Sequence, residues 1–163
     1  MDALSKNLLF SLVSKSRSTS LGTLHDGAPF VSMVLAAPDP TYSVWFLHLS
    51  RLSGHTKDLL EDGRSSLMLV VPDTGESDPQ QLARLTLVGK ATELSDGSAE
   101  EDSAKSIYLG RFPHMAELVD QLGDFSFWVF RPTTARFVGG FGRAFTLTPE
   151  SHRNELAGAE KGA

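Results

Sequence analysis

Hydroxyl and basic side chains gather in one short stretch of the sequence, where a strand is expected to end and a helix to begin. The stretch reads LHLSRLSGHTKDLL, from Leu47 to Leu60. The residues in it that bear on chemistry are Ser50, Arg51, Ser53, Gly54, His55, Thr56 and Lys57. Free backbone N–H groups at a helix start, the helix dipole and nearby cations together favour an anion. The stretch therefore predicts an anion site, with phosphate as the obvious biological candidate.

An ordinary helix cap explains the same residues without any ligand. In that interpretation Ser53 caps the helix, while Arg51 and Lys57 are solvated. The stretch contains neither a GxGxxG motif nor a GxxxxGKS/T motif, so the dinucleotide and P-loop mechanisms do not apply. Residue types alone leave both interpretations open.

Two of the five histidines are candidates for contact with a ligand. His48 lies near a strand end, where it would stack beside a flavin, ligate haem or simply occupy a strand position. His55 lies at a helix start, where the dipole disfavours a cation, so a bound anion would relieve that conflict. The others have no metal-ligand partner three or four residues away and are expected at the surface: His25, His114 and His152. No metal site is expected.

The composition excludes several kinds of chemistry. The 163 residues include no cysteine, which excludes disulfides, thiolate zinc sites, cysteine-ligated iron–sulfur clusters and a thiol nucleophile. The net charge of −5 argues against binding nucleic acid through the overall field. Because no hydrolytic triad or carboxylate pair is recognisable, no catalytic residue is assigned, and redox chemistry would have to come from a bound cofactor.

Targeting and membrane signals are also absent from the sequence pattern. No window approaches the ~20 apolar residues of a membrane span, and the N-terminal segment lacks the pattern of a signal peptide. We therefore expect a cytoplasmic protein with no membrane partner.

The elements that must position these residues are short strands interrupted by helices. Strands are expected over 18–24, 29–37, 43–49, 65–71, 82–94, 125–130, 135–138 and 143–148. Helices are expected over 2–15, 52–61, 100–110 and 114–122. This pattern favours a mainly β fold, a small β-barrel with flanking helices, in one domain over 1–148. The small and polar residues 149–163 predict a flexible C-terminal tail.

Four segments carry a resemblance to a known family. They are HDGAPFVSMVLAA, VWFLHLSRLSGHTKDLLEDGRSSLMLV, ARLTLVGKATEL and FRPTTARFVGGFGRA. In this order they resemble the pyridoxamine 5'-phosphate oxidase-like FMN-binding split barrels. The His-Thr helix start and the GlyGlyPheGly ending are most similar to the haem-utilisation-type branch of those proteins. The resemblance covers about residues 16–148.

The resemblance implies an FMN site at the two-fold interface of a homodimer. It assigns to the cofactor Ser32, Met33, Val34, His48, Leu49, Ser50, Ser53, Gly54, His55, Thr56, Lys57 and Arg84. In these terms the helix start holds the phosphate, and Arg84 is a polar flavin contact from another strand. We therefore expect one basic pocket, formed by Arg51, His55, Lys57 and Arg84.

Departures from the family pattern bear on the reaction. Val138 stands where the oxidases have a tryptophan, and residues 142–146 lack their Arg-x-His element. Ser32 and Gly54 stand where arginine is usual. These differences argue against pyridoxamine phosphate oxidation itself. The resemblance thus predicts a flavin-dependent oxidoreductase acting on a small-molecule substrate. The alternatives are a haem-binding or haem-degrading protein, a non-catalytic flavin-binding protein, and a deazaflavin in place of FMN.

Overall fold

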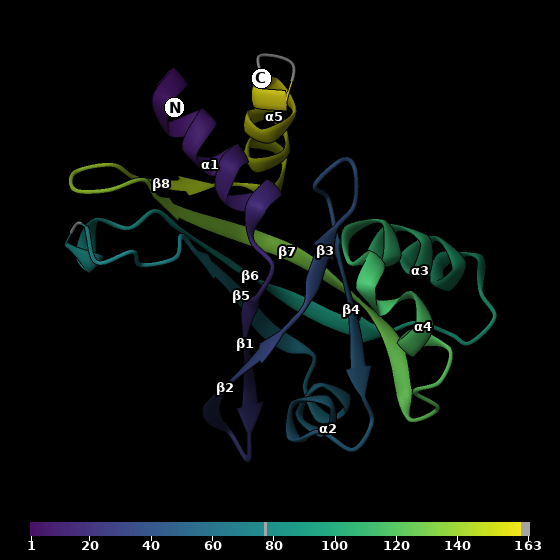
Figure 1. Ribbon diagram of the computed structural model, residues 1–163. Helices are drawn as coiled ribbons and strands as arrows, with labels where there is room; N and C mark the ends of the chain where they lie inside the picture. Colours follow the sequence, from purple (N-terminus) through teal and green to yellow (C-terminus); the bar gives the residue numbers. More distant parts are fainter. Residues whose placement is uncertain (77, 161–163) are drawn as a thin grey trace.

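The computed structural model describes residues 1–76 and 78–160, and its strands form one antiparallel sheet (Figure 1). The strands are β1 (Thr19–His25), β2 (Ala28–Val34), β3 (Ala36–Pro38), β4 (Trp45–Ser50), β5 (Arg64–Val70), β6 (Arg84–Glu93), β7 (Phe125–Val138) and β8 (Ala144–Leu147). Their order is β2-β1-β5-β6-β7-β4-β3, with β8 paired to β7. β2 and β3 lie at opposite ends of this order, yet only Leu35 separates them in the chain. The sheet therefore curls until its edges approach, and the predicted β-barrel with flanking helices is confirmed.

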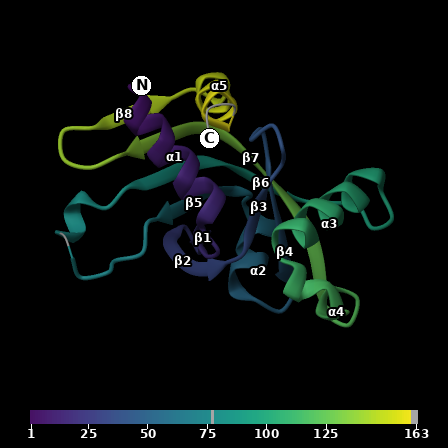
Figure 2. The same ribbon diagram turned by 45° about the horizontal axis from the view of Figure 1, so that its top comes forward.

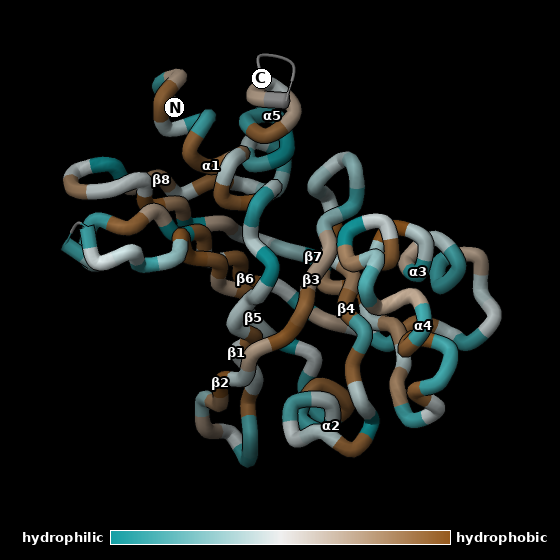
Figure 3. The backbone as a smooth tube through the Cα atoms, in the orientation of Figure 1, coloured by the Kyte–Doolittle hydropathy of each residue, from teal (hydrophilic) through white to brown (hydrophobic). Residues whose placement is uncertain are grey.

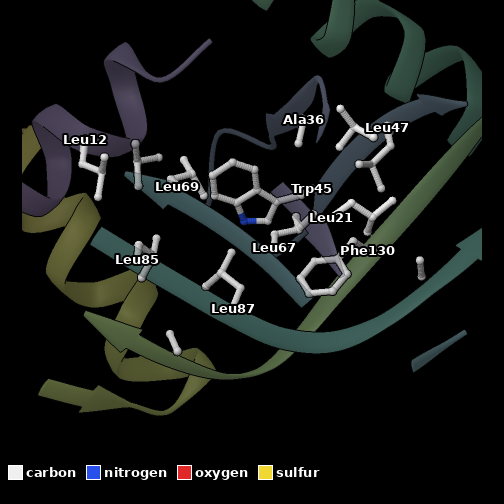
Figure 4. Packing of buried hydrophobic residues seen from close by; sticks show 14 of the residues in the cluster. Leu12, Leu21, Ala36, Trp45, Leu47, Leu67, Leu69, Leu85, Leu87 and Phe130 are labelled. Atoms are coloured by element: carbon white, nitrogen blue, oxygen red, sulfur yellow. The ribbon is translucent and has the colours of Figure 1, made fainter. Parts of the chain in front are cut away.

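The interior of the curled sheet is a row of leucines closed by large aromatic rings. Leu21 pairs with Leu67, and Leu67 pairs with Leu87, so their side chains share the inner face. All three are fully buried, and Trp45 and Phe130 pack among them (Figure 4). Burying side chains of this size contributes roughly 1.5–3 kcal/mol each. Figure 3 shows the hydrophobic colour following the strands through the middle of the molecule.

Helices flank the sheet in two groups, and the helix at 54–61 stands apart from both. The helices are α1 (Ala3–Lys15), α2 (Gly54–Glu61), α3 (Ala99–Arg111), α4 (Ala116–Val119) and α5 (Pro149–Glu160). α1 and α5 lie side by side at one end, and α3 and α4 lie together at another side (Figures 1 and 2). Asp2 caps α1 by accepting a hydrogen bond from the Ser5 N–H at 2.9 Å. None of the described helices combines the length and the apolar composition needed to cross a lipid bilayer.

The C-terminal segment differs from the prediction. The flexible tail predicted over 149–163 is instead helical from Pro149 to Glu160, and residues 161–163 lie outside the described part of the chain. His152 and Leu156, one helical turn apart, are both fully buried, so the prediction of a surface His152 is wrong. Glu155 on the same helix binds the N-terminal ammonium group at 3.1 Å. A narrow stripe of buried residues is enough to hold this helix against the rest of the protein. The stripe is hard to recognise in the sequence because the residues around it are small and polar.

The long strand β7 also differs from the prediction. It runs unbroken through 125–138, where the sequence predicts two strands. The pairing with β6 steps from Gly89–Pro132 to Val88–Thr134, so Thr133 is the extra residue of a β-bulge on β7, a place in a sheet where the neighbouring proline is tolerated. On β6 the register shift falls between Val88 and Gly89. A Cβ atom at Gly89 would lie 2.2 Å from a carbonyl oxygen of β7, so the close approach requires glycine. The helix predicted over 114–122 is shortened to a 3₁₀ turn at Pro113–Met115 and to α4.

Candidate functional site

Two residues of the predicted anion site already have protein partners. The Ser50 hydroxyl donates to Asp124 at 2.5 Å and accepts from the Leu52 N–H at 3.2 Å. Arg51 forms ion pairs with two carboxylates at 3.2 and 3.5 Å, those of Glu93 and Asp96. These contacts hold the loop between β4 and α2 in place. Ser50 and Arg51 therefore fix the backbone at the helix start and are not free to hold an anion.

The remaining polar side chains of the helix start are uncommitted. Ser53 occupies the N-cap position with φ −70° and ψ 146°, but its hydroxyl makes no capping hydrogen bond. The Thr56 hydroxyl is buried without a hydrogen-bond partner, and Lys57 forms no ion pair, within the part of the chain that the structure describes. Burial lowers the pKa of His55, so its ring is neutral at pH 7. The interpretation of Ser53 as a side-chain cap is wrong, and phosphate binding at this helix start stays a prediction.

A buried carboxylate ties α2 to the first hairpin. Asp58 accepts hydrogen bonds from Thr23 Oγ1 and His25 Nδ1, both at 2.7 Å. Burial would raise the pKa of Asp58, but these two hydrogen bonds lower it below its usual value. The same contact raises the pKa of His25, with Asp26 adding to the effect. His25 is exposed as predicted, yet it has a charged partner 33 residues away that no local spacing reveals.

His48 lies in the core and not at the helix start. Its ring packs against Phe127, Phe125 and Tyr108, with centroid distances of 4.5, 4.9 and 5.9 Å. Burial, with a smaller contribution from Lys105, lowers its pKa to about 4. The ring is therefore neutral at physiological pH and lies among aromatic side chains from α3 and β7. Of the three interpretations open to His48, the structure fits an ordinary strand position within the core.

The strand assigned to the flavin presents two faces. Val34 is buried, as is Leu49 of β4, and Ser32 lies opposite Leu21 on the inner face. Met33 points the other way and is 70% exposed. It belongs to a set of exposed apolar side chains on neighbouring strands, here called the outer face: Val31, Met33, Met68, Val70 and Val88. The register pairs Ser20 with both Met33 and Met68, which shows that β2 and β5 present these side chains to the same side.

Two arginines flank a hollow at the other end of this face. This hollow, here called the arginine hollow, has a volume of about 670 Å³. Its main lining residues are Arg84, Arg136, Val138, Phe141 and Ala144. Arg84 pairs with Val138, and Arg136 pairs with Thr86, so the arginines are diagonal neighbours on one face. Arg84 Nη1 donates to two backbone carbonyl oxygens at 3.1 and 3.2 Å, and Arg136 Nη1 donates to a hydroxyl at 2.8 Å. Neither guanidinium is paired with a carboxylate in residues 1–76 or 78–160.

The sequence predicts that Arg51, His55, Lys57 and Arg84 form one basic pocket, and within a single chain this prediction is wrong. Gly63, just after α2, accepts a hydrogen bond from the Ala91 N–H at 2.8 Å. Arg84 lies seven residues earlier on β6, which corresponds to roughly 23 Å of extended strand. Figures 1 and 2 show α2 and β8 at opposite ends of the sheet. The helix start and the arginine hollow are therefore two separate places on the protomer.

Arg136 and Phe141 line the hollow but are not among the site residues predicted from the sequence. Arg136 lies within a stretch predicted as an isolated short strand, so its pairing with β6 cannot be read from the sequence. Phe141 is 94% exposed between Gly140 and Gly142, whose φ values of 120° and 74° form the tip of the β7–β8 hairpin. The glycines around Phe141 are the only sign of this turn in the sequence, and the ring at its tip is open to solvent.

Comparison with known proteins gives relatives of two kinds. The heme oxygenase HOZ of Arabidopsis thaliana, a chloroplastic protein, is 35% identical over 138 residues, which cover 83% of this chain and 40% of that protein. A heme-binding protein from Mycobacterium smegmatis has a similar structure, with a TM-score of 0.79 and 29% identity over 92% of this chain and 60% of that chain. The chain thus spans less than two thirds of either relative.

A third comparison concerns the fold alone. A Clostridium acetobutylicum protein of the pyridoxinephosphate oxidase family, related to general stress protein 26, gives a TM-score of 0.65 at 18% identity. The match covers 93% of this chain and 99% of that one, which confirms the split-barrel fold. The model of the CREG beta-barrel family matches residues 10–154. The chain therefore belongs to the CREG beta-barrel family.

Proposed function

We propose that this protein binds haem in the arginine hollow. One observation carries the proposal: Arg84 and Arg136 lie next to each other beside apolar side chains. Among the described residues, no carboxylate forms an ion pair with either arginine. Haem combines a flat apolar ring with two propionates, so it needs apolar surface and two nearby cations. Arginine is suited to carboxylates because its planar guanidinium offers several N–H donors.

The residues around the arginines fit the rest of such a ligand. Val138 and Ala144 supply apolar surface beside them, and the exposed ring of Phe141 stands at the rim. Each guanidinium spends Nη1 on the protein and retains further N–H groups for a carboxylate. The similarity to proteins named for haem binding and for heme oxygenase supports the same ligand. Because those relatives are much longer, haem degradation by this chain is a separate question.

The outer face supports a homodimer. Five large apolar side chains exposed on adjacent strands form a surface of a kind that usually has a partner. We propose that two copies pack through this face, which adjoins the arginine hollow because Val70 pairs with Arg84. A dimer of this kind would exclude water from the apolar part of the ligand.

A flavin is the second candidate, because the start of α2 offers an uncommitted Ser53 hydroxyl and an unpaired Lys57 within the described chain. Those groups suit the phosphate of FMN. The haem and flavin proposals therefore concern two different places on the protomer.

Absorbance titration separates the two candidates. Purified protein is titrated with haem and, in parallel, with FMN. The proposal expects a saturable shift of the Soret band with haem and no quenching of FMN fluorescence. Saturable FMN binding with no Soret shift would replace haem by flavin. Adding ascorbate to the haem complex in air then shows whether the Soret band is lost, which reports degradation.

A further inference from the structure

A second cavity lies between α1 and the end of β5, away from the helix start and the arginine hollow, and it shares only Val70 with the outer face. It is a groove of about 570 Å³. One wall is α1, the other is the chain at 70–72, and the segment 16–18 closes one end. α1 contacts both β5 and β6, so the groove is built on the fixed body of the barrel (Figure 2).

The helical wall changes from apolar to basic along its length. Leu8, Ser11, Leu12 and Lys15 are spaced as neighbours on one helix face. The seven-residue span corresponds to about 10 Å along the helix axis. Leucines occupy one end, and Lys15 occupies the other, where Arg17 joins it from the following segment. The facing wall, at 70–72, is Val-Val-Pro and adds apolar surface.

The two cations at the basic end are free for a ligand. Lysine and arginine near a helix C-terminus often bind its last carbonyl oxygens. Here Arg111 of α3 does so instead, donating to the carbonyl oxygens of Val13, Ser14 and Ser16 at 2.6–2.7 Å. Neither Lys15 nor Arg17 has a hydrogen bond or an ion pair involving its side chain, as far as the described residues extend.

We propose that this groove is a second binding site, for an amphipathic carboxylate of the fatty-acid type. The apolar chain lies along Leu8 and Leu12 against 70–72, and the carboxylate meets Lys15 and Arg17. A groove with apolar walls and a few convergent polar groups is the usual form of a small-molecule site. The site shares no lining residue with the arginine hollow, so it does not depend on haem binding.

Decanoate is the probe, with decanol as its uncharged counterpart. Calorimetric titration of the full chain is expected to give saturable binding of decanoate and much weaker binding of decanol. In ¹H–¹⁵N spectra the amide shifts are expected to concentrate in residues 8–18 and 70–71. Equal binding of the two probes, absence of saturable binding, or amide shifts that leave residues 8–18 unchanged would each overturn the proposal.

Variants with matched charge sharpen the test. Arg17→Glu is expected to weaken decanoate binding by about tenfold, because an attraction becomes a repulsion at short range. Lys90→Glu makes the same charge change at an exposed position outside the groove, and binding is expected to change by less than about twofold. Ser11→Trp, which fills the groove, is expected to abolish binding while circular dichroism shows a folded protein. Equal effects of Arg17→Glu and Lys90→Glu would refute the assignment, and a normal haem titration in Arg17→Glu separates this result from failure of the haem proposal.

Discussion

The replacement His152→Leu is expected to make the protein resist acid better than the wild type. His152 is fully buried in α5, and neither of its ring nitrogens has a hydrogen-bond partner among the described residues. Burial, with a smaller contribution from Arg153, lowers the pKa of this histidine from its usual 6.5 to about 4. The folded protein therefore excludes a proton that the unfolded chain accepts.

The sign of the effect follows from that difference. As the pH falls below 6.5, the unfolded chain binds the proton first, so the free energy of unfolding decreases until the folded pKa near 4 is reached. Between pH 7.5 and pH 5.0 this linkage removes about 2 kcal/mol. His48, whose pKa is also lowered to about 4, contributes a similar loss. Replacing His152 alone should therefore remove its own contribution to the acid sensitivity, about 2 kcal/mol between pH 7.5 and pH 5.0.

Urea unfolding followed by circular dichroism measures this quantity. The free energy of unfolding is compared between wild type and His152→Leu at pH 7.5 and pH 5.0. Contributions from other groups, including the opposite pH dependence of His25, cancel when the two proteins are compared. The wild type is expected to lose about 2 kcal/mol more than the variant. Equal losses would refute the conclusion that His152 is buried and neutral.

Three further predictions concern α2, the bulge and the hairpin tip. Asp58→Asn should lower the pKa of His25, as followed by NMR titration, and destabilise the protein by about 2 kcal/mol because a buried charged hydrogen bond is lost; an unchanged His25 titration would contradict this. Gly89→Ala should lower the free energy of unfolding by about 2 kcal/mol, whereas Gly54→Ala, whose new methyl group meets open space, should have little effect. Similar unfolding midpoints for the two variants would be inconsistent with the bulge geometry. Phe141→Ala should leave thermal stability unchanged because the ring is 94% exposed, but weaken haem binding in an absorbance titration; a large fall in melting temperature would show that the ring packs in the fold.

Local patterns predict most of the barrel. A loose alternation marks β1 and a run of apolar residues marks β5, and Asp26 and Gly27, both with positive φ, form the tight turn between β1 and β2. The pattern fails where a tertiary contact decides the outcome. β7 continues past Pro132 through a bulge at Thr133 in its pairing with β6, and α5 packs against α1.

The candidate site is less predictable than the fold for the same reason. The types of residue at the start of α2 are visible in the sequence, but the partners that occupy Ser50 and Arg51 are distant in the chain. Arg84 is identified from the resemblance alone. Its neighbour Arg136 becomes evident only once the register of β6 and β7 is known. When strand pairing brings two site residues together, their positions in the sequence do not reveal that they are neighbours.

The affinity for haem of the Arg84→Ala/Arg136→Ala double variant tests the central claim most directly. Because both side chains are partly exposed, each charge-assisted contact is worth about 1 kcal/mol after screening, so the pair should cost about thirtyfold in Kd. Arg64→Ala is the control, since Arg64 is an exposed arginine paired with Asp62 away from the hollow. The proposal predicts a Soret titration about thirtyfold weaker in the double variant and unchanged in the control. A double variant that binds haem as tightly as the wild type would contradict it.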